Sequence, residues 1–195
     1  MSKSSKGSSF EREICTLLSK WWSNGKRDDI FWRTSGSGAR ATTRNKKGKT
    51  TFGQCGDVQA VDPIGQPLLD VCSIELKRGY NKYSFMDLID KPEKAKLQKY
   101  ELFIKQSIKE RKNAGVSFWI LITKRDRRKP LVCIPEALET VLELKWNNDK
   151  DTYEDDIPFL VSRYGSSHKQ IYIRTLEDFL KRYKPIYFEK IAFDR

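Results

Sequence analysis

The sequence contains a single histidine, His168, among its 195 residues. A zinc site built on histidines, or a catalytic triad with a histidine base, therefore has almost no residue to use. The four cysteines, Cys15, Cys55, Cys72 and Cys133, are scattered and form no Cys-x-x-Cys pair. We interpret them as buried thiols in a reducing compartment, because structural zinc sites and disulfide frameworks need cysteines at regular spacings.

Long apolar runs are also missing. No stretch of about 18 consecutive apolar residues occurs, so we expect no membrane-spanning helix and no membrane partner. The first ten residues, MSKSSKGSSF, contain no apolar signal region. We therefore expect a cytoplasmic protein.

Positive charge, in contrast, is in excess. Lys and Arg total 38 and Asp and Glu total 26, which gives a net charge of +12. Such a charge points to a polyanionic partner, with nucleic acid ahead of an anionic membrane surface, although a merely soluble basic protein is the alternative. The apolar content of 38% is too high for a disordered chain. The length suffices for one domain with a sizeable core.

Hydrophobic patterning predicts an α/β fold with a mixed central sheet flanked by helices. We expect helices at 10–22, 92–113, 135–144 and 176–183, and strands at 30–33, 116–123, 131–134, 159–165 and 169–174. Residues 56–79 are predicted to form a hairpin of two strands joined by a turn at 62–65. We expect a flexible N-terminus at 1–8, a core at 9–135, and a small α+β extension at 136–195 that packs on the core.

The predicted hairpin places charged residues on one face. Residues i and i+2 of a strand share a face, so Glu75 and Lys77 point together while Ile74 and Leu76 point into the core. Asp57 opens the first strand and meets Glu75 near the open end. Two ionised carboxylates need a cation between them or a raised pKa. Mg²⁺ fits that need, and a surface hairpin with a cross-strand ion pair is the alternative.

Three further segments leave alternatives open. The Gly-, Lys- and Arg-rich stretch at 34–56 is either a solvated loop or, as we favour, a loop that contacts phosphates, although it lacks P-loop spacing. The basic turn KRDRRK at 124–129 is either solvated or a non-specific phosphate contact. Trp21 faces the core by periodicity. For Trp22 we favour partial burial over a role in base stacking or in a dimer contact.

The order of these motifs resembles the PD-(D/E)XK nuclease superfamily. GDVQAV supplies the motif aspartate, Asp57, and IELK supplies Glu75 and Lys77. Within the superfamily, residues 6–135 resemble archaeal-type Holliday junction resolvases and similar phage enzymes. The loop at 39–55 is longer than in compact resolvases, and residues 136–195 have no counterpart there.

The N-terminal region carries the same resemblance. KGSSFERE is similar to the resolvase N-terminus, in which a helix holds a metal-site glutamate, and that role falls on Glu11, with Glu13 as second choice. RTSGS is similar to the resolvase loop with a functional serine, which falls on Ser35 or Ser37.

The resemblance implies a restriction-endonuclease-like fold and a metal site. Asp57, Glu75, the carbonyl of Leu76 and Glu11 would hold Mg²⁺ or Mn²⁺. Lys77 would orient the attacking water or stabilise the developing charge. The implied catalytic set is Glu11, Asp57, Glu75, Lys77 and Ser37. The implied DNA contacts are Arg33, Ser35, Arg40, Arg44, Lys46, Lys47 and Lys49.

The implied function is a Mg²⁺-dependent DNA endonuclease that is selective for branched DNA and takes part in recombination or packaging in a phage or prophage. Resolving a junction needs two symmetric cuts, so a homodimer follows. One alternative is a restriction-like or nicking enzyme that acts on duplex DNA. A second is a basic DNA-binding protein without catalysis.

Overall fold

The structure is a computed structural model that describes residues 3–34, 56–92, 94–147, 160–164 and 169–194. The helices are α1 (Lys3–Trp22), α3 (Gln66–Val71), α4 (Lys99–Ala114), α5 (Glu136–Asn147), α6 (Leu176–Arg182) and α7 (Pro185–Phe193), with short 3-10 helices η1 (Pro63–Gly65) and η2 (Phe85–Leu88). The strands are β1 (Phe31–Arg33), β2 (Val58–Ala60), β3 (Cys72–Arg78), β4 (Phe118–Lys124), β5 (Leu131–Pro135), β6 (Leu160–Tyr164) and β7 (Lys169–Thr175).

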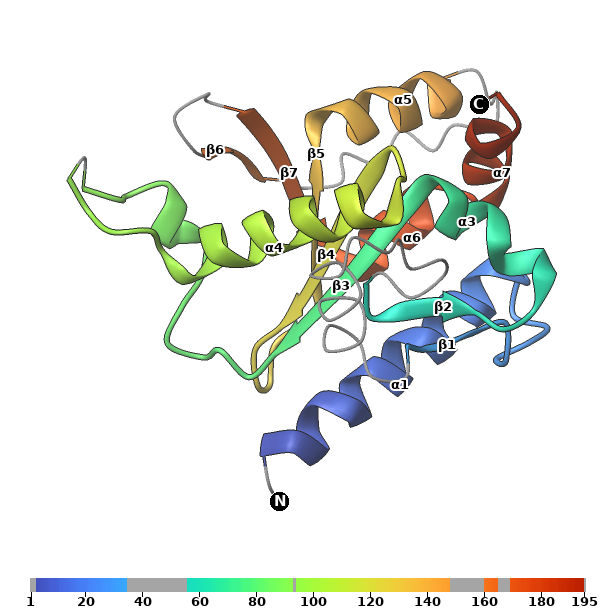
Figure 1. The fold of residues 1–195 in the computed structure, drawn as a ribbon, viewed down its shortest axis with the longest axis horizontal. Coiled ribbons are helices and arrows are strands. Elements are labelled where there is room, and N and C mark those ends of the chain that lie inside the picture. The colour runs from blue at the N-terminus through green and yellow to red at the C-terminus, as the bar shows by residue number, and fades with distance from the viewer. Residues whose placement is uncertain (1–2, 35–55, 93, 148–159, 165–168, 195) are drawn as a thin grey trace.

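A five-stranded mixed sheet forms the centre of the fold (Figure 1), in the order β3-β4-β5-β7-β6. Strands β3 and β4 are parallel, and the other neighbours in this sheet are antiparallel. Strands β1 and β2 pair with each other in a separate antiparallel ribbon. The predicted mixed α/β fold is confirmed, and β3 lies at an edge of the main sheet.

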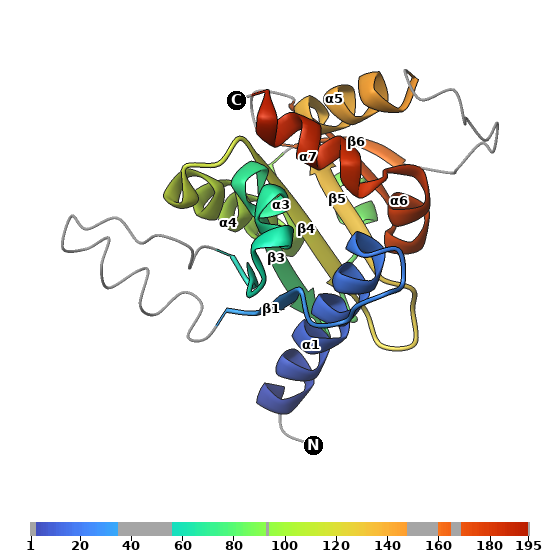
Figure 2. The same ribbon diagram turned by 90° about the vertical axis from the view of Figure 1, so that its right-hand side faces the viewer.

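Helices cover both faces of this sheet, as the turned view shows (Figure 2). Side chains alternate along each strand, so Ile74, Leu76, Ile120 and Ile122 contribute to one core cluster with residues of α1, α3, α5, α6 and α7. Trp119 and neighbouring side chains on the opposite face pack with α4 and η2 in a second cluster. The edge of β3 therefore lies between α1 on one side and α4 on the other.

The C-terminal segment shares the central sheet. Strand β7 pairs with β5, and Phe179, Tyr183 and Phe188 of the last two helices lie in the larger core cluster. The division at residue 135 stays a prediction, and segments on both sides of it build one sheet. Among the residues that the structure describes, no helix combines the length and apolarity needed to cross a membrane.

The predicted hairpin at 56–79 is wrong. Strand β2 pairs with β1, β3 pairs with β4, and α3 lies between β2 and β3. Leu68 and Val71 are buried at a spacing of three, which suits a helix, and Pro67 lies in its first turn. Periodicity alone does not separate such a short apolar run from a buried strand. The turn at 62–65 is confirmed, because the Asp62 side chain accepts from the Ile64 N–H and starts η1.

Helix boundaries account for the other corrections. Helix α1 begins at Lys3, within the segment predicted to be flexible. Helix α4 begins at Lys99 rather than at Pro92, because Gln98 and Glu101 form a capping box there. Its predicted end is confirmed by Gly115, which has a φ of +69°.

The end of the chain also differs from the prediction. Helix α6 is not the last helix, because α7 follows it. The Thr175 side chain caps the start of α6 by accepting from the Asp178 N–H. The roles of the tryptophans are reversed: Trp22 is buried and donates to the carbonyl of Ile64, whereas Trp21 is partly buried.

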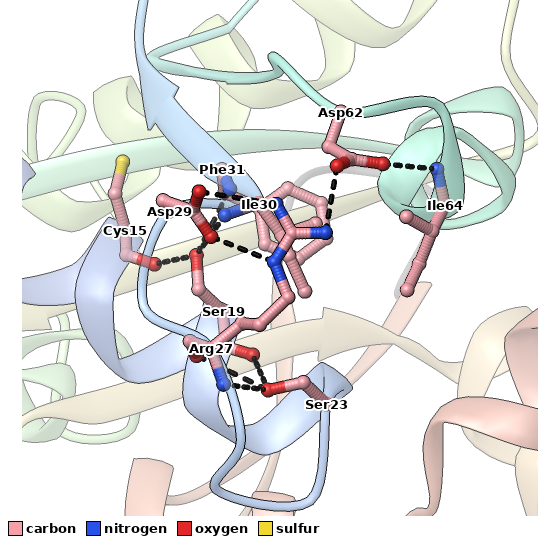
Figure 3. A network of polar contacts seen from close by, with 9 residues as sticks. All are labelled: Cys15, Ser19, Ser23, Arg27, Asp29, Ile30, Phe31, Asp62 and Ile64. Atoms are coloured by element: carbon pink, nitrogen blue, oxygen red, sulfur yellow. Dashed lines mark hydrogen bonds and ion pairs between the residues drawn. The ribbon is translucent and has the colours of Figure 1, made fainter.

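A polar network ties the end of α1 to β1 and η1 (Figure 3). The buried Ser19 hydroxyl donates to the Cys15 carbonyl at 2.8 Å and accepts from the N–H groups of Ile30 and Phe31 at 3.1 and 2.9 Å. Nearby, the Arg27 guanidinium pairs with Asp29 and with Asp62, at 2.8 and 2.7 Å. The network fixes the ribbon of β1 and β2 against α1.

We expect Ser19→Ala to lower the free energy of unfolding by about 2–4 kcal/mol, because it leaves two buried N–H donors without an acceptor. Chemical denaturation measures this loss. The control is Ser9→Ala, at an exposed position on the same helix. Equal stabilities for the two variants would contradict the role given to Ser19.

Candidate active site

Asp57 lies against the free edge of β3. Its N–H donates to the carbonyl of Ile74 at 2.8 Å, and its Oδ2 accepts from the N–H of Leu76 at 2.8 Å. The N–H and C=O of one strand residue point to the same side, so the Leu76 carbonyl also points towards Asp57. The sequence analysis predicted that Asp57 lies next to Glu75 because the two were expected to pair in one hairpin. In the structure β2 and β3 do not pair, and the two hydrogen bonds of Asp57 to β3 bring these segments together.

Gly56 makes this approach possible. Its φ is +84°, and a Cβ atom at this position would lie 2.7 Å from the carbonyl oxygen of Ile74. Only glycine combines this backbone conformation with so close an approach to another strand. The Gly-Asp pair therefore presents the Asp57 carboxylate to β3.

Glu75 and Lys77 share one face of β3, as strand alternation predicted, and α4 covers this face. The Lys77 ammonium forms an ion pair with the Glu75 carboxylate and lies 5.9 Å from the centre of the Phe103 ring. Gln106 of α4 donates to Oε1 of Glu75 at 2.6 Å. Both Glu75 and Asp57 are buried, so this group of charges is largely withdrawn from water.

Burial and neighbouring charge shift the pKa values of this group. Burial raises the pKa of Glu75 to about 7, the Asp57 carboxylate adds to the rise, and Lys77 opposes it. Burial alone would lower the pKa of Lys77, but the carboxylates of Glu75 and Asp57 outweigh it and raise that pKa. Lys77 therefore stays protonated at neutral pH. A protonated lysine is suited to stabilising negative charge rather than to acting as a general base.

Helix α1 contributes Glu11 to the same region. Burial raises the pKa of Glu11, the Asp57 carboxylate adds to the rise, and Arg33 and Lys77 oppose it. Glu11 therefore lies near Asp57, Arg33 and Lys77. Arg33 of β1 donates to Oε2 of Glu11 at 3.3 Å. Glu13 instead pairs with Lys124 at 2.6 Å on the exposed side of the helix. Of the two candidate glutamates, Glu11 is the one beside Asp57.

Comparison with family models identifies the chain. The model described as "Phage putative PDDEXK endonuclease" matches residues 2–190. The chain belongs to this family. The predicted membership of the PD-(D/E)XK superfamily is confirmed, and the match runs well beyond residue 135, where the resemblance seen in the sequence ends. No curated protein and no solved structure matches the chain.

The residues that resemble the motif in the sequence meet at the edge of β3. These are Asp57 and the Glu-x-Lys triplet of Glu75, Leu76 and Lys77. Among the described residues, no three His, Cys, Asp or Glu side chains form a group ready to hold a metal ion. The donor set at the edge consists of two carboxylates and a backbone carbonyl, which are the oxygen ligands that Mg²⁺ and Mn²⁺ prefer.

Most of the predicted DNA contacts lie outside the described residues. These are Ser35, Arg40, Arg44, Lys46, Lys47 and Lys49, and Ser37 of the predicted catalytic set lies outside the described residues as well. Arg33 is described, and it pairs with Glu11 rather than pointing away from the site. The N–H of Thr34 donates to the carbonyl of Asp57 at 3.0 Å, so the chain leaves β1 directly beside Asp57.

Sequence reasoning missed Gln106. This residue lies in the middle of α4 and reaches Glu75 only because α4 packs over β3. Gln106 is exposed, and an exposed glutamine in a helix carries no pattern of its own, so no local signal could have identified it. Its amide donates to the Glu75 carboxylate from α4.

Proposed function

We propose that the protein is a DNA endonuclease that depends on a divalent metal ion, Mg²⁺ or Mn²⁺. The observation that supports this most strongly is the meeting of Asp57 with the Glu-x-Lys strand, in a chain that belongs to a PDDEXK endonuclease family. The net charge of +12 favours a polyanionic substrate. The family description names the reaction class, and the metal and the DNA structure that is cut belong to our proposal.

Each residue at the edge has a role in this account. Asp57, Glu75 and the carbonyl of Leu76 would hold the ion, and Glu11 would bind it directly or through water. The chemistry that such an ion would supply is polarisation of the scissile phosphate and a lower pKa for a water molecule. Lys77 remains protonated and places positive charge beside the phosphate that accepts the attack. Gln106 and Lys77 hold the Glu75 carboxylate in position.

The proposed substrate is branched DNA, such as a four-way junction, cut by a homodimer. The test is cleavage of end-labelled junction, duplex and single-stranded DNA by the purified protein with Mg²⁺. Preferential cutting of the junction supports the proposal. Equal cutting of plain duplex would replace the branched substrate by duplex DNA and keep the endonuclease. DNA binding without cleavage in any divalent metal would favour a non-catalytic binding protein.

Glu11 and Glu13 offer a matched pair of variants. We expect Glu11→Gln to lower the single-turnover cleavage rate by about 10–100-fold, as is usual when a residue that supports a metal site is lost. Glu13→Gln removes the same charge two residues away, on the exposed side of α1, and should leave the rate within about twofold of the wild type. A larger loss in the Glu13 variant would assign the helical ligand to Glu13.

A further inference from the structure

A basic site separate from the candidate active site lies on the face of the sheet that α4 covers, at the turn between β4 and β5. A cavity of about 250 Å³ is lined there by Tyr100, Thr123, Arg125, Arg128, Lys129 and Leu131. Three of the six lining side chains are cationic, and none of the six is acidic. Since a water molecule occupies about 30 Å³ in the liquid, the cavity has room for an anionic group together with several waters.

Thr123, which lines the cavity, lies next to the Glu-x-Lys triplet of β3. Thr123 is the strand partner of Lys77 in the parallel pair of β3 and β4, so the two side chains lie on the same face. Neighbouring strands are about 4.8 Å apart. Phe103 connects the two places, because its ring lies 5.9 Å from the Lys77 Nζ and 5.5 Å from the Tyr100 ring. The cavity is thus the immediate neighbour of the candidate active site.

The acidic groups around the turn are already engaged. Glu177 pairs with Lys129 at 3.0 Å, between two exposed side chains. Asp126 accepts from the Asn81 amide at 3.0 Å and lies 3.9 Å from the Nε of Arg78. The turn lies beside the segment that leaves β3 (Figure 1), and these contacts hold it there. Arg125 and Arg128 form no ion pair with any residue that the structure describes.

The backbone of the turn supplies an independent observation. The N–H of Arg128 donates to the carbonyl of Arg125 at 3.2 Å, which closes a β-turn, and Arg127 inside it has a φ of +60°. Glycine or asparagine suits that position, and an arginine there costs backbone energy. A positively charged side chain thus occupies a turn position where a small residue would be more stable.

We propose that this cavity binds a backbone phosphate of the DNA substrate, next to the phosphate that is cut. The proposal rests on the proposed function for the identity of the polyanion. Arg125 and Arg128 neutralise the phosphate, with Lys129 at the rim, and the tip of the turn extends the contact. This site sets the path of the DNA across the α4 face, and the ion-binding residues act on the neighbouring phosphate.

The test compares Arg125→Gln/Arg128→Gln with the wild type in binding a short fluorescein-labelled duplex, followed by fluorescence anisotropy in EDTA over a range of salt concentrations. We expect the affinity to fall on the order of tenfold and the slope of log affinity against log salt to become shallower by about 0.9, the value for one lost phosphate contact. In cleavage assays, the loss should appear in the DNA concentration that gives half the maximal rate.

The control is Lys20→Gln/Lys26→Gln, which removes two exposed charges near the far end of α1 and should keep the affinity and slope of the wild type. A folded Arg125/Arg128 variant with wild-type affinity and slope would overturn the proposal, as would an equal loss in the control. If the double variant fails to fold, Arg128→Gln alone, at an exposed position, must still weaken binding. If the wild type cuts no DNA but the double variant still binds DNA more weakly than the wild type, the phosphate site is retained and the proposed function is rejected.

Discussion

Replacing Asp57 by asparagine is expected to lower the single-turnover rate of DNA cleavage by about 10²–10³-fold, the scale of loss when one group that stabilises transition-state charge is removed. The amide oxygen of asparagine still accepts from the N–H of Leu76, so the edge of β3 keeps its geometry. What is lost is the negative charge that a divalent ion needs. The melting temperature should change little, and DNA affinity measured in EDTA should be kept.

A second readout of the same variant is independent of cleavage. Because the Asp57 carboxylate contributes to the raised pKa of Glu75, Asp57→Asn should move that pKa down towards the ordinary value for a glutamate. Carbon-detected NMR titration of the metal-free protein measures the change. The matched control is Asp70→Asn, which removes an exposed carboxylate from α3. A full cleavage rate in the Asp57 variant would show that the metal is held elsewhere.

Replacing Gly56 by alanine is expected to produce the second large effect. The added Cβ meets the Ile74 carbonyl at 2.7 Å, so the segment must move away from β3 and the two hydrogen bonds of Asp57 must lengthen or break. A displacement of about 1 Å at a reacting centre costs about 10²-fold in rate. The strained backbone should also lower the free energy of unfolding by about 1–3 kcal/mol.

Gly25 provides the control for this effect. Its φ of +82° is close to that of Gly56, but a Cβ there would meet nothing within 4 Å. Gly25→Ala therefore carries the same backbone strain without the steric contact, and it should lose stability while keeping its cleavage rate. Comparable losses of rate in both variants would show that reduced stability, rather than the position of Asp57, limits the activity.

The sequence predicted the part of the site that strand geometry determines. Alternation along a strand places Glu75 and Lys77 on one face and Leu76 in the core, and this follows wherever the strand lies in the sheet. The choice between Glu11 and Glu13 did not follow, since both lie near the edges of the apolar face of α1. The structure separates them because Lys124 attracts Glu13 while Asp57 and Arg33 flank Glu11.

The errors come from contacts between distant segments. The predicted hairpin was wrong, but the predicted position of Asp57 beside β3 was not affected. The position of Asp57 depends on Gly56 and on two hydrogen bonds to β3, and not on how the residues between them fold. Gln106 reaches Glu75 from a helix that begins after the predicted first turn at Pro92. Such positions depend on tertiary packing, which outweighs local propensity and periodicity.

The central claim is that the edge of β3 cuts DNA with the help of a divalent ion. The most direct test is single-turnover cleavage of end-labelled DNA by the wild type and by Glu75→Gln, each with Mg²⁺ and with EDTA. Our account predicts cleavage only by the wild type with Mg²⁺, and each cut should leave a phosphate on one fragment and a hydroxyl group on the other. Cleavage that persists in EDTA, or at an equal rate in the Glu75 variant, would contradict it.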